Sequence, residues 1–500
     1  MRDAIHNHRG DTLRVKHRPG PGRVEIVADE PNLTPFAGLL VTGEIARRTG
    51  LVEALDAQIA AVRRAGPIKV RARGISPGEL VVSVAEAQLA GGTHFEHLRA
   101  LRADAPGAPL RAVPGAPAPQ TALRLAGAFR ASHLRAVERA LAEAGRRLDD
   151  ALSRPRGEGV TLDVDTLPVV VHGRAKQGAG WTRDGRRAYQ PLVVSWAERG
   201  RPLAWDLLSG AQVPKGRPAT AVLRRALRLL PAGHGPVWVR MDSAFYALDT
   251  LGLIHRAGAR FSLSVPRLPA FWRALEGIPA GAWRPCRDMD GAECAEVAYT
   301  PQEWEHGPLR LVVRRVRIGA GDISRHARAR RRRTIPADQL ALAEAGELGF
   351  VYGYSFILTN APAPTHDARA VEHHHRMRAQ IEERFKDAKL GMALSHLPSG
   401  DRNANLVWLA ASLVALALAA FTCDLHPAAR ASEPAPPAAA ALADRRPLRR
   451  HGATLRRLLI CVPARVARTA RRLVLHLPQG LLGAPAFQAA YARARTLAAP

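Results

Sequence analysis

The sequence predicts an α/β fold in which a sheet flanked by helices follows an all-α region and is interrupted by a β-rich segment. Residues 31–152 place apolar side chains at helical spacing between turns, whereas from residue 159 apolar runs of strand length alternate with helices. Such alternation is typical of α/β sheets. Because 500 residues exceed one ordinary hydrophobic core, we expect more than one domain.

The charge balance is strongly basic. Lys and Arg number 73 against 44 Asp and Glu, which gives a formal net charge of +29. This excess favours a polyanionic partner, with nucleic acid first and an anionic membrane surface second. Only six of the 73 are lysines, so a GC-rich coding sequence also explains part of the arginine excess.

The cysteines and the N-terminus favour a cytoplasmic protein, which in a bacterium lies with the nucleoid. Four cysteines, Cys286, Cys294, Cys423 and Cys461, match neither a zinc spacing nor a dense disulfide framework. The first 20 residues lack the apolar core of a signal peptide. An apolar run at 406–421 is shorter than the roughly 20 residues that span a bilayer, so we expect a buried helix and no membrane partner.

The N-terminal part divides at residues 30 and 152. Residues 1–30 are expected to form a flexible basic tail, and 31–152 a helical DNA-binding domain. A proline-rich break, VPGAPAPQ, precedes Thr121, which is a suitable cap for the following helix. Short basic helices suit DNA binding, but a generic helical bundle fits this pattern equally well.

The α/β core is expected in two pieces, 153–265 and 351–425, separated by a β-rich insertion at 266–350. The insertion contains an arginine-rich run at 325–333, which either contacts phosphates or is simply solvated. An Ala/Pro-rich linker at 426–444 and a basic C-terminal segment at 445–500 complete the chain.

The stretch RAQIEERFKDAKLG at 378–391 is predicted to be helical. Its apolar stripe, expected to face the core, consists of Met377, Ile381, Phe385, Ala388 and Met392. A second line on the same helix consists of His375, Arg378, Glu382 and Lys389. That line is either a solvated face or one functional surface, and the choice depends on acidic residues elsewhere in the chain.

Acidic residues occur at two apolar strands. In TLDVDT, Asp163 and Asp165 alternate with apolar residues and share one strand face, and in PVWVRMDS the apolar run stops at Asp242. Carboxylates among buried residues require a cation or a strong hydrogen-bond network. Together with Glu382 they form a set of oxygen ligands that suits Mg²⁺ or Mn²⁺ and phosphodiester chemistry.

These residues resemble the DDE transposases of bacterial insertion sequences, in the branch marked by Tyr-x2-Arg-x3-Glu-x6-Lys. Arg378, Glu382 and Lys389 match three positions of that signature, and His375 stands where the family has tyrosine. LDVDT resembles the strand of the first catalytic aspartate, which favours Asp165 over Asp163 as the ligand, with Asp163 an additional candidate. VRMDSAFY resembles the motif of the second aspartate, Asp242.

The resemblance implies an RNase H-like catalytic core with Asp165, Asp242 and Glu382 as catalytic residues and Mg²⁺ or Mn²⁺ ligands. It further implies that His375, Arg378 and Lys389 contact DNA. The implied reaction is cleavage at the terminal inverted repeats of an element followed by strand transfer into target DNA, carried out by a homodimer in a synaptic complex. No nucleotide cofactor is expected, because no phosphate-binding loop occurs in a suitable context.

Two other function classes fit part of the sequence: a sequence-specific DNA-binding protein with an inactive core, and a general metal-dependent nuclease. Among lesser motifs, the run His373–His375 is a weak zinc candidate, because consecutive helical side chains point in different directions. Trp272, Trp283 and Trp304 of the insertion are candidates to stack on an unpaired base, with core packing as the alternative.

Overall fold

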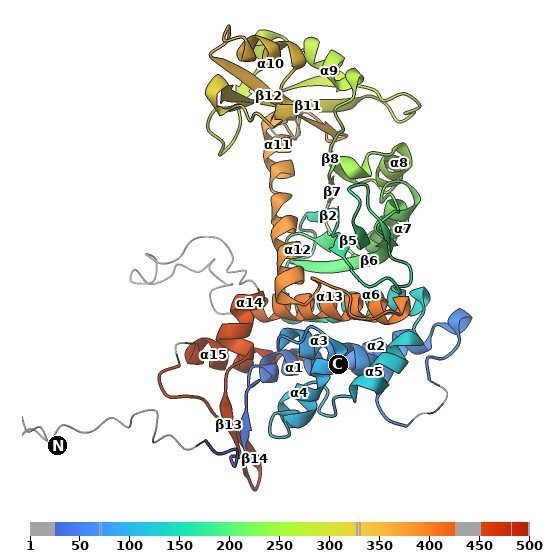
Figure 1. Ribbon diagram of the computed structural model, residues 1–500, viewed down its shortest axis with the longest axis vertical. Helices are drawn as coiled ribbons and strands as arrows, with labels where there is room; N and C mark the ends of the chain where they lie inside the picture. Colours follow the sequence, from blue (N-terminus) through green and yellow to red (C-terminus); the bar gives the residue numbers. More distant parts are fainter. Residues whose placement is uncertain are drawn as a thin grey trace, which may run out of the picture.

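Three regions follow one another along the long axis of the molecule: a layer of helices, a sheet with helices on it, and the outer part of that same sheet (Figure 1). The computed structural model describes residues 26–498 apart from 70, 72, 327, 328, 330, 331, 426–451 and 482. The predicted linker, most of the predicted tail and part of the arginine-rich run therefore lie outside the described residues.

A mixed sheet of eleven strands forms the middle and outer regions, in the order β3-β5-β2-β7-β8-β12-β11-β10-β9, with β4 and β6 also paired to β5. Strand β2 is parallel to β7, and β7 to β8, whereas the other pairs are antiparallel. The strands are β2 (Val160–Thr166), β3 (Val169–Val170), β4 (Gly180–Trp181), β5 (Arg187–Trp196), β6 (Arg201–Ser209), β7 (Val237–Met241), β8 (Arg260–Ser264), β9 (Arg284–Pro285), β10 (Ala292–Tyr299), β11 (Leu309–Gly319) and β12 (Phe350–Thr359).

The two faces of β2 meet different surroundings, as its alternating sequence predicts. Val160, Leu162 and Val164 are buried in a core shared with α7 (Arg217–Arg228) and α8 (Leu248–Arg256). The opposite face carries Asp163 and Asp165 toward α11 (Ala368–Arg376) and α12 (Ala379–Gly391). Strand β2 therefore presents apolar side chains to one face of the sheet and its two aspartates to the other.

The insertion continues the same sheet. Strand β12 pairs with β11 over ten residues but with β8 over only three, so it belongs as much to the insertion as to the preceding strands. Helices α9 (Pro269–Glu276) and α10 (Ala337–Glu344) accompany these outer strands. The sequence placed β12 in the core because its apolar run looks like any buried strand, and only the pairing shows its neighbours.

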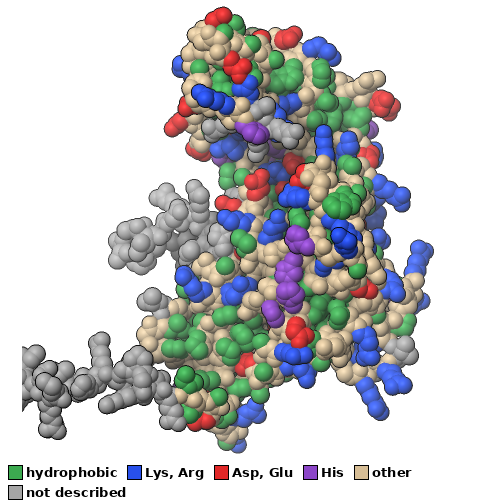
Figure 2. Space-filling view, in the orientation of Figure 1, with side chains coloured by type: hydrophobic (Ala, Val, Ile, Leu, Met, Phe, Trp, Pro, Cys, Tyr) green, Lys and Arg blue, Asp and Glu red, His purple; other side chains and the backbone are tan. Residues whose placement is uncertain are grey.

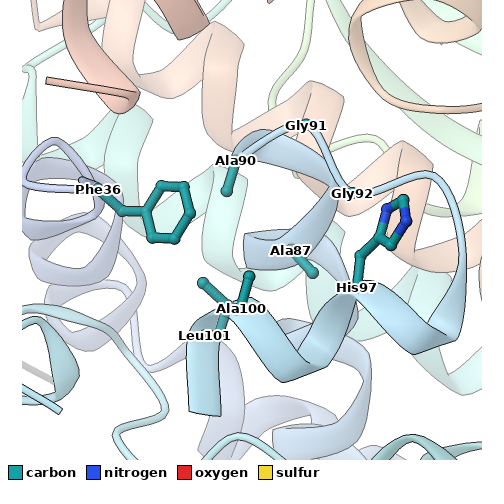
Figure 3. Close-up of a pocket in the computed structure, with 8 residues that line it drawn as sticks. All are labelled: Phe36, Ala87, Ala90, Gly91, Gly92, His97, Ala100 and Leu101. Carbon is teal, nitrogen blue, oxygen red and sulfur yellow. The ribbon is translucent and has the colours of Figure 1, made fainter. Parts of the chain in front are cut away.

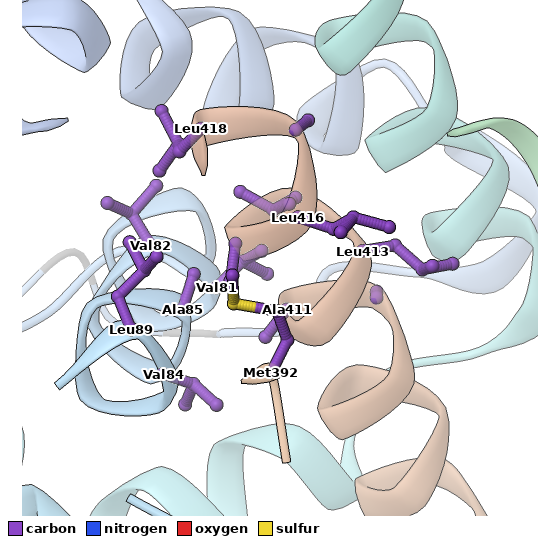
Figure 4. Packing of buried hydrophobic residues seen from close by; sticks show 14 of the residues in the cluster. Val81, Val82, Val84, Ala85, Leu89, Met392, Ala411, Leu413, Leu416 and Leu418 are labelled. Atoms are coloured by element: carbon purple, nitrogen blue, oxygen red, sulfur yellow. The ribbon is translucent and has the colours of Figure 1, made fainter. Parts of the chain in front are cut away.

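The helical layer is built around α13 (Arg402–Asp424). Residues of this helix share one hydrophobic core with residues of the N-terminal helices. Figure 4 shows Val82 of the N-terminal part beside Leu418 of α13, and Val81 beside Met392. The helices are α1 (Leu39–Arg48), α2 (Leu51–Ala60), α3 (Pro77–Leu89), α4 (Leu98–Ala103), α5 (Pro119–Gly127) and α6 (Ala131–Ala151).

The apolar run at 406–421 lies within α13, as expected of a buried helix. By length and composition this helix could cross a membrane, but 89% of its most apolar stretch is buried inside the protein. Its N-terminus is capped by Asp401, whose side chain accepts a hydrogen bond from the backbone N–H of Ala404 at 3.0 Å. Helix α13 is therefore a core element placed between the sheet and the N-terminal helices (Figure 1).

The C-terminal segment returns to the N-terminal layer. Strand β1 (Leu33–Thr34) pairs with β13 (Ala464–Thr469), which forms a hairpin with β14 (Arg472–His476). Phe487 of α15 (Ala484–Thr496) is buried in the same core as α1 and α13. The short α14 (Gly452–Leu455) completes this part. The region 31–152 therefore shares its core with residues more than 300 positions away, for example Gln88 bonded to Trp408.

Candidate active site

Asp163 and Asp165 lie two residues apart on β2 but have different partners. Asp163 is fully buried and accepts two hydrogen bonds from the guanidinium of Arg240 on β7, at 2.7 and 2.9 Å. Arg240 also donates to the backbone carbonyl of His374 at 2.7 Å. Asp163 is therefore half of a buried ion pair that joins two strands and the end of α11.

Asp165 and Asp242 converge on one cation. Arg378 Nη2 lies 2.8 Å from Asp165 Oδ2 and 3.7 Å from Asp242 Oδ2. Asp242 follows the last residue of β7 and accepts a hydrogen bond from the backbone N–H of Ala244 at 2.9 Å. Two strand ends and the start of α12 thus bring together side chains that are distant in the sequence.

The charge of Glu382 also acts on Asp165. Glu382 lies in the first turn of α12 with an exposed side chain. Burial, together with the nearby charges of Asp242 and Glu382, raises the pKa of Asp165 to about 6, although Arg378 acts to lower it. A carboxylate crowded by two others in a partly buried position is poised to bind a cation.

Helices α11 and α12 form one column with a break at Met377 and Arg378 (Figure 1). The backbone N–H of Arg378 bonds to the carbonyl of His375, and that of Ile381 to the carbonyl of Arg378, three residues back instead of four. The predicted apolar stripe holds for Ile381, Phe385, Ala388 and Met392, which are buried, but Met377 is 36% exposed.

The comparison with known families decides the identity. A family model described as transposase DDE domain, group 1, matches residues 20–499. The chain belongs to the DDE transposase family. No curated protein matches it. Among solved structures, the synaptic complex of piggyBac transposase with hairpin DNA aligns over 77% of this chain and 74% of that chain, with 10% sequence identity and a TM-score of 0.36.

The site offers a hard divalent cation two carboxylates, those of Asp165 and Asp242. Among the described residues, no group of three or more His, Cys, Asp or Glu side chains is arranged to hold a metal ion. The guanidinium of Arg378 nevertheless shows that the carboxylates of Asp165 and Asp242 face a common position that accepts positive charge. Carboxylate oxygens are the ligands that Mg²⁺ prefers in proteins.

His375 differs from the expectation that it contacts DNA. It is buried, and its ring nitrogens lie 3.0 Å from Ser262 Oγ and 2.9 Å from Ser264 Oγ on β8. Burial, with the nearby charge of Arg378, lowers its pKa to about 3, so the ring is neutral. His375 docks α11 on the sheet in this structure. Its neighbours differ as well: His373 pairs with Asp288, and His374 contacts Thr161.

Lys389 lies seven residues beyond Glu382 in the last turn of α12 and is half-buried. Burial lowers its pKa, and the charge of Arg186, in the turn between β4 and β5, lowers it further. Lys389 therefore stands beside a second basic element, which the sequence analysis did not single out.

The three tryptophans proposed as stacking candidates pack inside the insertion. Trp283 and Trp304 are buried, and Trp272 is half-buried against Tyr354 and Phe356. The sequence analysis did not single out Arg240 or Trp181. The only signal in the sequence for Trp181 is the set of basic residues around it.

A small apolar pocket beside α3 contains no candidate catalytic residue (Figure 3). It is lined by Phe36, Ala87, Ala90, Gly91, Gly92, His97, Ala100 and Leu101.

Proposed function

We propose that this transposase cleaves DNA at the ends of its own insertion sequence and transfers the freed strands into target DNA. The observation that carries the proposal is that the carboxylates of Asp165 and Asp242, from two neighbouring strands, face the same guanidinium of Arg378, and that the charge of Glu382 acts on Asp165. Family membership over residues 20–499 supports DNA transposition as the process.

In this proposal the three carboxylates hold Mg²⁺ or Mn²⁺. The bound ions would activate the attacking oxygen and neutralise charge on the leaving oxygen. Arg378 is placed to pair with a phosphate of the incoming strand, because a guanidinium binds phosphate as well as carboxylate in a bidentate manner. Lys389 offers a second positive charge about 16 Å further along α12 from Arg378, at 1.5 Å per residue.

The wider organisation belongs to the same proposal. Strands β2, β5 and β7 with α11 and α12 would form an RNase H-like core, and the N-terminal helices and C-terminal hairpin would bind the terminal inverted repeats. A homodimer would hold two ends together in the synaptic complex. The exposed face in Figure 2 has Lys and Arg side chains spread over all three regions, which suits a long DNA path.

The test uses the terminal repeats found in the DNA that flanks the gene. We expect Asp165→Asn, Asp242→Asn and Glu382→Gln each to abolish Mg²⁺-dependent end cleavage, by a factor of at least about a thousand, because transition-state charge stabilisation is lost. End binding should stay close to wild type. Gel-based cleavage and binding assays of labelled duplexes measure both.

The other function classes give different results in the same assays. Binding of the repeats by wild-type protein with no cleavage in Mg²⁺ or Mn²⁺ would indicate a DNA-binding protein with an inactive core. Cleavage without joined products when target DNA is supplied would indicate a nuclease. Normal cleavage by any of the three variants would remove that residue from the proposed catalytic set.

A further inference from the structure

One aromatic side chain stands out on the surface near the candidate active site. The chain has eight tryptophans, and all of them lie in the described residues. Six are buried and Trp272 is half-buried, whereas Trp181, on β4, is 66% exposed. Tryptophan contributes a large apolar surface when it is covered, so a single one left in solvent marks a surface that a partner covers.

The backbone that presents Trp181 is held firmly. The preceding loop is joined to the start of α13, where the backbone N–H of Gln177 donates to the carbonyl of Gly400 at 3.0 Å. Lys176 Nζ donates to the carbonyl of Ser399 at 3.1 Å, and Arg187 donates to the carbonyl of Gly173 at 2.7 Å. Trp181 is therefore displayed on an ordered hairpin, which lowers the entropic cost of binding.

The hairpin is also basic. Arg183 and Arg186 are exposed in its turn, and Arg174 is exposed in the loop before it. The turn has one acidic residue, Asp184, which accepts a hydrogen bond from Arg186 Nε at 2.7 Å. Because Lys and Arg are spread over the whole visible face (Figure 2), positive charge alone does not mark this place. What marks this place is an aromatic side chain among exposed arginines. Bases stack on such a side chain while the cations pair with the phosphates.

Strand β5 pairs both with β2, which carries Asp165, and with β4, which carries Trp181. On β5, Val193 pairs with Asp165 of β2, and Arg187 pairs with Trp181 of β4. Six residues of strand span about 20 Å. Successive nucleotides of one DNA strand rise about 3.4 Å, so this distance corresponds to about six nucleotides. The charge of Arg186 acts on Lys389, so the hairpin lies near the helix that also carries Glu382.

From this geometry we propose that Trp181 stacks on an unpaired base of the bound DNA strand, about six nucleotides from the phosphate that is cut. The proposal rests on the proposed function for the position of the cut, but stacking itself is independent of catalysis. Arg183 and Arg186 pair with the phosphates on either side of that base. Trp181 is thus a positioning residue that holds the strand in register with the carboxylates.

The first experiment measures binding of fluorescein-labelled oligothymidylate by the full chain. We expect Trp181→Ala to weaken binding by roughly ten-fold, since loss of one stacked base costs on the order of 1–3 kcal/mol. Trp181→Phe should retain most of the affinity because phenylalanine keeps an aromatic face. Leu342→Ala, on α10, changes another exposed apolar side chain at 40% and is the control that should bind as wild type. Equal affinity of Trp181→Ala and wild type would overturn the proposal.

The second experiment places 2-aminopurine at successive positions of a duplex that carries the element end. Wild type should alter the fluorescence at one position about six nucleotides from the cut, and Trp181→Ala should abolish that signal. If wild type fails to cleave any end but the oligothymidylate result holds, the proposed function fails and the stacking proposal stands. If wild type cleaves and no position responds to Trp181, the stacking proposal fails alone.

Discussion

Asp163 and Asp165 show how much the surroundings decide the role of a residue. Both are carboxylates on the same face of β2, yet Asp163 is enclosed with Arg240 and Asp165 meets Arg378, Asp242 and Glu382. A buried charge that has one dedicated counter-ion is already satisfied and has no oxygen to offer a ligand. Burial raises the pKa of both aspartates, and for Asp165 the charges of Asp242 and Glu382 add to that effect.

At this scale we expect Asp163→Asn to lower the free energy of unfolding by about 3–5 kcal/mol, because it leaves the Arg240 guanidinium buried without a counter-ion. Asp165→Asn should not lower the free energy of unfolding, because a neutral side chain relieves the repulsion from Asp242 and Glu382. Urea unfolding in the presence of EDTA measures both.

The compensating control is the double variant Asp163→Leu/Arg240→Met, which replaces the buried pair with apolar groups and should recover most of the stability. Folded Asp163→Asn protein should retain some end cleavage, unlike Asp165→Asn. A single Asp163→Asn variant as stable as wild type would contradict the structural role of this pair.

At the scale of elements, α13 is the helix around which the helical layer is built. Its apolar run was recognised in the sequence as a buried helix, and its burial against α3 and the other N-terminal helices confirms this. The break between α11 and α12 was not recognised, because a spacing pattern does not show where hydrogen bonds shift from four residues back to three. The break turns Arg378 toward the sheet, where it meets Asp165.

Shortening a buried side chain of α13 tests the role of this helix in the core. Leu413 is fully buried, so Leu413→Ala should lower the free energy of unfolding by about 2–5 kcal/mol through lost burial and a residual cavity. The exposed Leu123, changed to alanine, is the control and should cost less than about 1 kcal/mol. Thermal and urea unfolding compare the two. Equal small effects would mean that α13 packs loosely.

At the scale of the whole molecule, the two ends of the described chain depend on each other. Strand β1 has β13 as its partner, and Leu459, Ile460 and Phe487 are buried in the core that α1 and α13 share. The division into an N-terminal helical region and a basic C-terminal segment reflects composition, whereas the packing makes them one body. The predicted roles of the two parts in DNA binding stay predictions.

A chain ending at residue 425 should therefore lose several kcal/mol of stability, because each large apolar side chain that loses its burial partners contributes about 1.5–3 kcal/mol. We expect a lower thermal midpoint and faster proteolysis within 31–152. Arg471→Ala in the exposed turn between β13 and β14 is the control and should match wild type. An unchanged midpoint in the shortened chain would show that the N-terminal layer folds without the C-terminal segment.

The sequence by itself determined the family, the alternation of β2 and the burial of α13, because motif spacing and apolar periodicity are local properties. Tertiary structure alone decided which aspartate is enclosed, that His375 faces inward, and that Trp181 is the tryptophan left in solvent. Those outcomes depend on partners far along the chain: Asp163 meets Arg240 at a separation of 77 residues, and Asp165 meets Arg378 at 213. Local patterns fix which face a side chain occupies, and only the folded chain fixes what that face meets.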